Sequence, residues 1–200
     1  MVQPFTFTTS PARIVFGPGS SSTIAAEMQN AGVASALVLS TPHQTDLAND
    51  VAQQLGAHAA GVYTNATMHT PVSVTDDAMA AYAQSGADCV VAVGGGSTTG
   101  LGKAIAYRND TVQIVVPTTY AGSEVTPILG QTENGVKTTV RAASILPEVV
   151  IYDSFEGIDS DSSPLRFRGC FTTTMSQAML TETFVIYDAA EPTTAPNWFD

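Results

Sequence analysis

Short apolar runs and longer mixed stretches alternate along the first 153 residues of the chain. The apolar runs have the length of strands that are buried on both faces, and the mixed stretches have the length of helices. Strands are expected at Ala36–Leu39, Gly61–Tyr63, Asp88–Val93, Gln113–Val116 and Pro147–Asp153. Helices are expected at Ser22–Asn30, Asp46–Leu55 and Val72–Gln84. This alternation predicts βαβ units and an open parallel-sheet α/β fold of the dinucleotide-binding kind.

Two stretches break the alternation of strands and helices. Phe5–Thr8 and Arg13–Phe16 alternate in polarity and predict an N-terminal pair of short strands. Val125–Leu129 and Val136–Val140 flank a turn that contains Asn134-Gly135. Asn-Gly between alternating runs is a strong signal for a β-hairpin.

A glycine-rich run, Gly94–Lys103, follows one expected strand and leads into an expected helix at Lys103–Ala106. Glycines let backbone N–H groups approach a phosphate, and a helix N-terminus adds partial positive charge. Ser97 and Thr98 can cap the helix or bond a phosphate oxygen. The run matches neither of the two common phosphate-binding patterns, so a tight turn that binds nothing is the alternative.

A second loop of hydroxyl-bearing and small residues, Pro117–Glu124, follows the strand at Gln113–Val116. Parallel strands bring their carboxyl ends to one edge of the sheet, where open α/β folds bind ligands. The two loops are therefore expected to lie together and form a site.

The composition limits what this site can bind and how. The chain has 200 residues, 44% of them hydrophobic, which suits one domain or one domain with an appendage. A net charge of −11, with few and scattered basic residues, argues against a nucleic-acid surface. An anionic cofactor would therefore depend on backbone dipoles and a few local cations.

Other classes of site and segment are not indicated. No run of about 18 apolar residues predicts a membrane span, and the N-terminus lacks the pattern of a secretory signal, so a cytoplasmic protein is expected. Cys89 and Cys170 make no disulfide framework. The three histidines have no metal-ligand spacing, so no metal is expected. They are His43, His58 and His69.

The pattern changes after Asp153. Ser154–Ser163 is rich in acidic residues and serine, and a Pro- and Thr-rich stretch ends the chain. We therefore expect a dinucleotide-binding domain over residues 1–153 and a poorly ordered tail over residues 154–200.

Six stretches in order between Pro11 and Asp153 carry a family resemblance. They are Pro11–Gly19, Met68–Val72, Gly94–Lys103, Val116–Gly130, Gly135–Thr139 and Leu146–Asp153. With them the chain resembles the iron-containing alcohol dehydrogenase superfamily, and most closely its maleylacetate reductase branch. The resemblance implies an NAD(P)H-dependent oxidoreductase. In this branch the substrate is maleylacetate, which is reduced at its carbon–carbon double bond to 3-oxoadipate during aromatic catabolism.

The resemblance also implies a set of cofactor contacts. The pyrophosphate would lie on Gly94, Gly95, Gly96, Ser97 and Thr98. The nicotinamide side would be lined by Thr118, Thr119 and Ser123, and Lys137 would offset phosphate charge. Ser40-Thr41 stands where NAD-preferring relatives often place an Asp on the adenosine ribose, so both NAD and NADP stay open. Gly100, where many relatives carry Asp, favours the maleylacetate reductase branch. A homodimer is a further expectation from the family.

Ser154–Asp200 does not match the all-helical second domain of the family, which carries most substrate contacts. We therefore expect low activity for this chain by itself. The alternatives are a non-catalytic nucleotide-binding remnant or partner subunit, and a product that folds poorly. Dehydroquinate synthase and glycerol dehydrogenase share the cofactor half of the fold, but Gly100 argues against both.

Overall fold

A six-stranded parallel sheet runs through the centre of the protein in the computed structural model, which describes residues 12–119 and 121–153. The strand order is β1-β8-β5-β4-β2-β3. The strands are β1 (Arg13–Phe16), β2 (Ala36–Leu39), β3 (Ala59–Tyr63), β4 (Cys89–Gly94), β5 (Val112–Pro117) and β8 (Val149–Tyr152). Every residue of β2, β4 and β8 is buried, as their apolar sequences predict. The expected open parallel α/β fold is confirmed.

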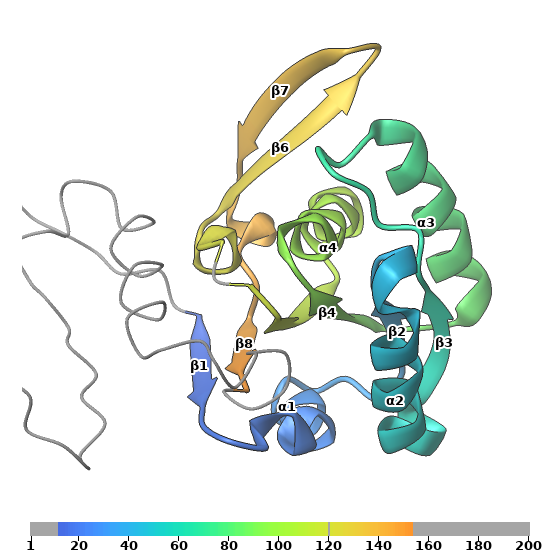
Figure 1. Cartoon of the computed structure of the whole chain (residues 1–200), viewed down its shortest axis with the longest axis vertical. Coiled ribbons are helices and arrows are strands. Elements are labelled where there is room, and N and C mark those ends of the chain that lie inside the picture. Colours follow the sequence, from blue (N-terminus) through green and yellow to red (C-terminus); the bar gives the residue numbers. More distant parts are fainter. Residues whose placement is uncertain (1–11, 120, 154–200) are drawn as a thin grey trace, which may run out of the picture.

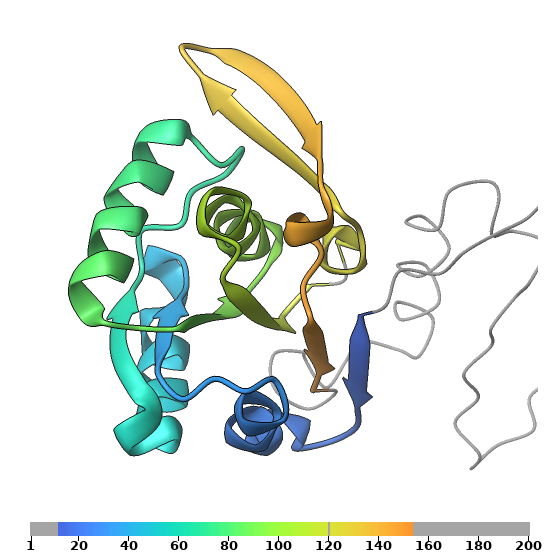
Figure 2. The ribbon, with the colours of Figure 1, turned by 180° about the vertical axis from the view of Figure 1, so that it is seen from behind.

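Two helices cover each face of the sheet (Figures 1 and 2). On one face α1 (Ile24–Asn30) and α2 (Thr45–Leu55) pack on the sheet through Met28 and Val51. On the other face α3 (Val72–Ser85) and α4 (Gly96–Asn109) pack through Ala78, Leu101 and Ile105. Short 3-10 turns lie at Ser20–Thr23, Pro42–Gln44, Gly56–His58, Ser123–Val125 and Ala143–Ile145. In the described ranges no helix has both the length and the apolar character needed to cross a membrane.

The start of α4 corrects the sequence interpretation. The helix was expected from Lys103, but it begins at Gly96, so only Gly95 separates it from the end of β4 at Gly94. Glycine has low intrinsic helix propensity, which is why the run was interpreted as a loop. Close packing overrides that propensity, because Gly102 lies against the sheet with Ala92 Cβ within 3.5 Å of where its own Cβ would be.

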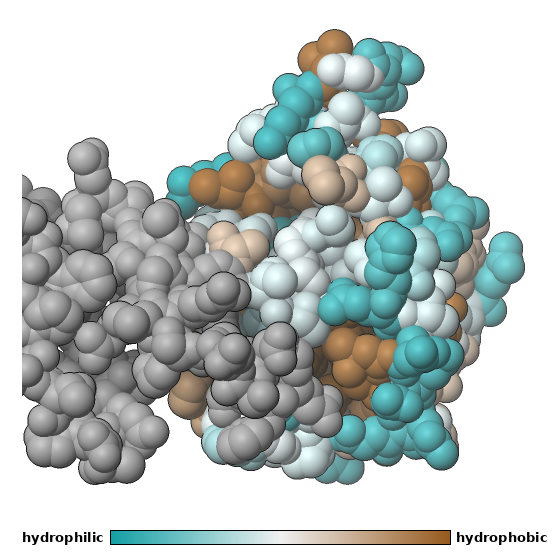
Figure 3. Space-filling model, viewed as in Figure 1, coloured by the Kyte–Doolittle hydropathy of each residue, from teal (hydrophilic) through white to brown (hydrophobic). Residues whose placement is uncertain are grey.

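The expected β-hairpin is present and projects from the body of the protein (Figure 1). It consists of β6 (Ile128–Glu133) and β7 (Val136–Arg141), joined by Asn134-Gly135 with φ values of 50° and 76°. The strand expected at Val125–Leu129 was wrong in its bounds, because residues 123–125 form a 3-10 turn and pairing begins at Ile128. Apolar side chains are exposed at the free end of the hairpin and near its base (Figure 3).

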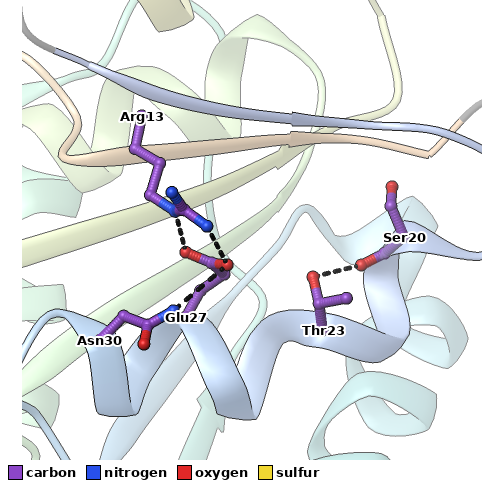
Figure 4. Close-up of polar contacts among 5 residues, drawn as sticks. All are labelled: Arg13, Ser20, Thr23, Glu27 and Asn30. Carbon is purple, nitrogen blue, oxygen red and sulfur yellow. Dashed lines mark hydrogen bonds and ion pairs between the residues drawn. The ribbon is translucent and has the colours of Figure 1, made fainter.

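Polar contacts fix the first strand and the turn that follows it. In the described residues β1 pairs in parallel with β8, whereas its expected partner at residues 5–8 lies outside the described residues. Arg13 binds Glu27 of α1 through two hydrogen bonds of 2.6 and 3.1 Å (Figure 4). The Asp153 carboxylate accepts the backbone N–H groups of Gly19 and Ser21, each at 2.9 Å.

The described residues end at Asp153, so the tail expected at residues 154–200 and its boundary stay predictions.

Candidate functional site

The carboxyl ends of β4 and β5 lie side by side and bring two loops together, as the sequence predicted. The register pairs Gly94 with Pro117, and the Thr118 N–H donates to the Gly94 carbonyl at 3.0 Å. Gln44, which follows β2, donates from Nε2 to Thr118 Oγ1 at 3.1 Å. Three strand ends therefore contribute to one edge of the sheet, where open α/β folds bind their ligands.

Two glycines at this edge leave little room for a side chain. A Cβ atom on Gly94 would lie 2.5 Å from Thr98 Oγ1 and 2.8 Å from Gln44 Oε1, and φ of Gly94 is 150°. A Cβ atom on Gly95 would lie 3.0 Å from Thr119 Oγ1. The backbone is therefore bare at the point where β4 turns into α4, and a ligand can approach it closely.

The N-terminus of α4 offers backbone donors at the same point. Thr98 and Thr99 donate their N–H groups to the Gly95 carbonyl, each at 3.1 Å. Within the described part of the chain, the N–H groups of Gly96 and Ser97 have no acceptor. No acidic side chain lies in the first turn of this 14-residue helix. Free donors at the positive end of a helix are suited to an anion.

A pocket of about 360 Å³ opens beside this helix end. Its walls come from α4, the segment around Ser123, the β6–β7 hairpin and the loop before α3. The lining residues are Met68, His69, Thr70, Gly96, Ser97, Gly100, Lys103, Ser123, Ile128, Leu129, Gly130 and Lys137. Both lysines of the chain line this pocket and no carboxylate does, although the net charge of the chain is −11. The pocket is therefore locally cationic in an acidic protein.

Lys103 is buried completely in the wall of the pocket. Its ammonium donates to the carbonyl of Ser123, to the carbonyl of Thr126 at 2.7 Å and to the carbonyl of Ile128 at 3.0 Å. It also lies 3.1 Å from Ser123 Oγ and 3.2 Å from Thr126 Oγ1. Burial lowers the pKa of Lys103 to about 7, and the charge of Glu124 opposes that shift.

Glu124 is the carboxylate nearest to this lysine in the segment. It is buried, and its Oε1 accepts the hydroxyl of Tyr152 at 3.1 Å. Burial raises the pKa of Glu124 above its ordinary value, while hydrogen bonds from Tyr152 and from backbone N–H groups act in the opposite direction. The residue therefore ties the segment to β8 through Tyr152.

The comparisons with known proteins agree with this architecture. The model of the family described as iron-containing alcohol dehydrogenase matches residues 11–154. The chain belongs to the iron-containing alcohol dehydrogenase family. A second model, for a family of unknown function (DUF6446), matches residues 137–200 and overlaps the end of the first match. The resemblance inferred from the six sequence stretches is thus confirmed.

Named relatives of this family cover the same part of the chain. The maleylacetate reductase of Rhizobium sp. (strain MTP-10005) is 67% identical over 153 residues, which are 76% of this chain and 44% of that protein. The maleylacetate reductase of Sphingobium indicum is 51% identical and covers 74% of this chain and 42% of itself. The crystal structure of maleylacetate reductase from Agrobacterium tumefaciens is 65% identical, with a TM-score of 0.74 over 76% of this chain and 43% of that one. The chain spans less than half the length of the curated relatives it matches.

The residues that the sequence singled out lie in the pocket, at the sheet edge beside it and at the end of β2. Gly96, Ser97, Ser123 and Lys137 line the pocket. Gly94, Gly95, Thr98, Thr118 and Thr119 lie at the adjacent sheet edge. Their contacts with a cofactor stay predictions. The Thr98 hydroxyl is buried and has no hydrogen-bond partner in the described residues.

Ser40 and Thr41 stand at the end of β2, apart from the pocket lining. Ser40 is fully buried, and its hydroxyl donates to the Val93 carbonyl at 2.8 Å. Its side chain therefore holds β2 against β4. Thr41 is half-buried and precedes the 3-10 turn at Pro42–Gln44. The role of these two residues at an adenosine ribose stays a prediction.

Three residues of the site were missed or undervalued from the sequence. Lys103 was noted only as the end of the glycine run, and Gln44 was not considered. His69 was named from the sequence only as a histidine without metal-ligand spacing, and the structure places it in the pocket lining. A lysine within the apolar sequence Leu-Gly-Lys-Ala-Ile-Ala was the available signal for Lys103, because an unpaired charge is seldom buried.

In the described residues no group of three or more His, Cys, Asp or Glu could hold a metal ion.

Proposed function

We propose that the chain binds NADH or NADPH at the carboxyl edge of its sheet, as the cofactor-binding part of an oxidoreductase of the maleylacetate reductase type. One observation carries this proposal: the bare backbone at Gly94-Gly95 and the free N–H groups of α4 open beside a pocket that holds both lysines and no carboxylate. The 67% identity to a maleylacetate reductase supports it.

The residues present fit a dinucleotide. Gly94 through Thr98 would hold the pyrophosphate, because a Cβ atom would fill the space beside the backbone at Gly94 and Gly95. Thr118, Thr119 and Ser123 would line the nicotinamide side. Lys137 is exposed at the mouth of the pocket and would offset phosphate charge. The end of β2 at Ser40-Thr41 carries no carboxylate to repel a 2′-phosphate, so the proposal includes both cofactors.

The reaction proposed for the full-length type of protein is the reduction of maleylacetate to 3-oxoadipate. A bound reduced nicotinamide supplies the hydride, and the protein binds and orients it. Because the chain spans less than half of its relatives, dinucleotide binding and turnover are separate proposals. The alternative is a nucleotide-binding partner or remnant without turnover. We further propose a cytoplasmic protein that can form a homodimer.

Binding is tested by titrating the full chain with NADH and following nicotinamide fluorescence. Gly96→Ala is the decisive variant, since its Cβ would meet only Ala121 Cβ, at an ordinary 3.5 Å, yet would stand among the pyrophosphate donors. We expect unchanged thermal stability and a Kd raised at least tenfold, the equivalent of about 1.4 kcal/mol. Gly61→Ala in β3 is the matched control, because its Cβ would meet Leu37 Cδ1 at 3.6 Å, far along the chain from the site.

Two results would decide against parts of the proposal. Absence of NADH binding, or equal binding by Gly96→Ala and the wild type, contradicts the cofactor site. Oxidation of NADH in the presence of maleylacetate separates the two functions. Binding with turnover supports a reductase, whereas binding without turnover supports the partner or remnant.

A further inference from the structure

The ammonium of Lys103 joins α4 to the segment Ser123–Ile128 in the wall of the pocket. Three backbone carbonyls, those of Ser123, Thr126 and Ile128, converge on Nζ. A protonated lysine has three N–H donors, one for each carbonyl. A neutral amine has two donors and a lone pair, so one of the three carbonyls would face that lone pair; the Ser123 carbonyl would keep the N–H and the hydroxyl of Thr126, each at 3.1 Å, as donors. The closed arrangement of this segment therefore requires the charged form.

The same ammonium determines the direction of the Ser123 hydroxyl. Ser123 Oγ lies 3.1 Å from Lys103 Nζ, and because an ammonium can only donate, this oxygen accepts a share of one of the three N–H donors in a three-centre hydrogen bond. The proton of the hydroxyl is then available for another acceptor. Ser123 lines the pocket, so a ligand bound there would supply an acceptor for this proton.

We propose that Lys103 is a positioning residue of this site: its ammonium holds the Ser123–Ile128 segment against α4 and presents the Ser123 hydroxyl as a donor to a ligand oxygen, so that tight dinucleotide binding requires the protonated lysine. This inference rests on the proposed function and deepens it. The ligand chemistry is a carbonyl, carboxamide or phosphate oxygen of the dinucleotide.

The charge on Lys103 makes binding at this site dependent on pH. Burial lowers the pKa of Lys103 to about 7, so the side chain loses its proton within the neutral range. The charge that acts on it comes from Glu124 of the segment, and Lys137 and His69 line the same pocket. The strands β2, β4 and β5 against which α4 packs carry no charged residue, and Asp76 of α3 lies 3.9 Å from Arg108. Binding is therefore expected to weaken as the pH rises through about 7.

The test measures the Kd of NADH for the full chain between pH 6 and 9. NADH is the probe because it lacks the 2′-phosphate, which titrates in that range by itself. We expect the wild-type Kd to rise above neutral pH by up to ~10-fold per pH unit. Ser123→Ala should raise the Kd at low pH. His69→Gln is a necessary control, since His69 also lines the pocket, and the rise of the Kd with pH should survive in it.

Two variants of Lys103 make the inference falsifiable. Lys103→Met should bind NADH weakly, and its Kd should show no step, that is, no rise as the pH passes through the neutral range. Lys103→Arg keeps the charge across the whole range, so the step should disappear even if some affinity is retained, and this variant answers the question if the methionine variant does not fold. Arg141→Gln, a loss of charge on β7 outside the pocket lining, should keep the wild-type profile.

The outcomes separate this inference from the proposed function. A flat wild-type profile, a step that persists in Lys103→Arg, or a step that disappears in His69→Gln would overturn the role of Lys103 and leave dinucleotide binding intact. No NADH binding at any pH would overturn both. A step that is lost only in the Lys103 variants supports the inference.

Discussion

The Thr70 hydroxyl lies where a side chain on Gly100 would begin: a Cβ atom at position 100 would be 2.5 Å from Thr70 Oγ1. Thr70 cannot move away easily, because it is buried, has a φ of 45° and accepts the N–H of Thr132 at 3.2 Å. Alanine in place of a helical glycine normally stabilises by about 1 kcal/mol. Here we expect Gly100→Ala to destabilise the protein by ~1–3 kcal/mol in urea unfolding, because the contact is overpacked.

The second variant that isolates this contact is Thr70→Ala. It removes Oγ1 and leaves the Thr70 Cβ, which would be 3.8 Å from the new atom. In that background Gly100→Ala should cost nothing or stabilise the protein. An equal loss in both backgrounds would show that another contact causes the destabilisation. The close approach also gives a physical reason for glycine at position 100 of this chain.

Local signals predicted most of the fold. The apolar runs around Val38 and Val91 could only be buried strands, and Asn134-Gly135 specified a turn that needs positive φ values at both residues. The order of helices and strands then left few topologies for a parallel sheet. These features depend on residues close together in the sequence, which is why they could be predicted.

The parts that were wrong or missed depend on contacts between distant residues. Gly96 begins a helix because α4 packs closely on the sheet and on Thr70, a contact that propensity does not report. Pairing in β6 begins at Ile128 rather than at Val125, and the carbonyls of the intervening segment point to Lys103. No sequence pattern predicts that a lysine takes the place of strand pairing as the hydrogen-bond partner of three backbone carbonyls.

The ion pair between Arg13 and Glu27 predicts a dependence of stability on pH. The hydrogen bonds from Arg13 lower the pKa of Glu27 below its ordinary value of 4.5. The unfolded chain therefore takes up this proton at a higher pH than the folded chain. The stabilisation is complete above pH 4.5 and is lost as the pH falls through the lower folded pKa. We expect Glu27→Gln to lower the urea midpoint at pH 7, and the difference from the wild type should shrink as the pH falls below 4.5.

The control for this ion pair is Glu133→Gln, which removes the same charge from an exposed position at the end of β6. It should shift the midpoint little at either pH. If Glu27→Gln lowers the midpoint equally at both pH values, the loss comes from packing rather than from the ion pair.

The hairpin turn predicts a second stability effect. Gly135 has a φ of 76°, and a Cβ atom there would meet no atom within 4 Å, so only backbone strain opposes a side chain. Gly135→Ala should destabilise by about 1 kcal/mol in urea unfolding. Asn134→Gly, at a φ of 50°, keeps the turn accessible and should change stability by less. If Gly135→Ala leaves the free energy of unfolding unchanged, the hairpin does not contribute to the cooperative unfolding of the domain.

Lys137 offers a test of the charge in the pocket that does not involve folding. Its side chain is exposed on β7, and its Cε would lie 3.1 Å from a Cβ atom on Gly130, so the hairpin register places it over the pocket. An exposed cation beside a phosphate attracts it through solvent, and salt screens that attraction. Lys137→Met should therefore raise the Kd of NADH several-fold at low salt and little at high salt. Arg141→Met removes the same charge from the same strand outside the pocket and should leave the Kd unchanged at both. Equal effects of the two variants would mean that the net charge of the hairpin, rather than a contact at Lys137, attracts the dinucleotide.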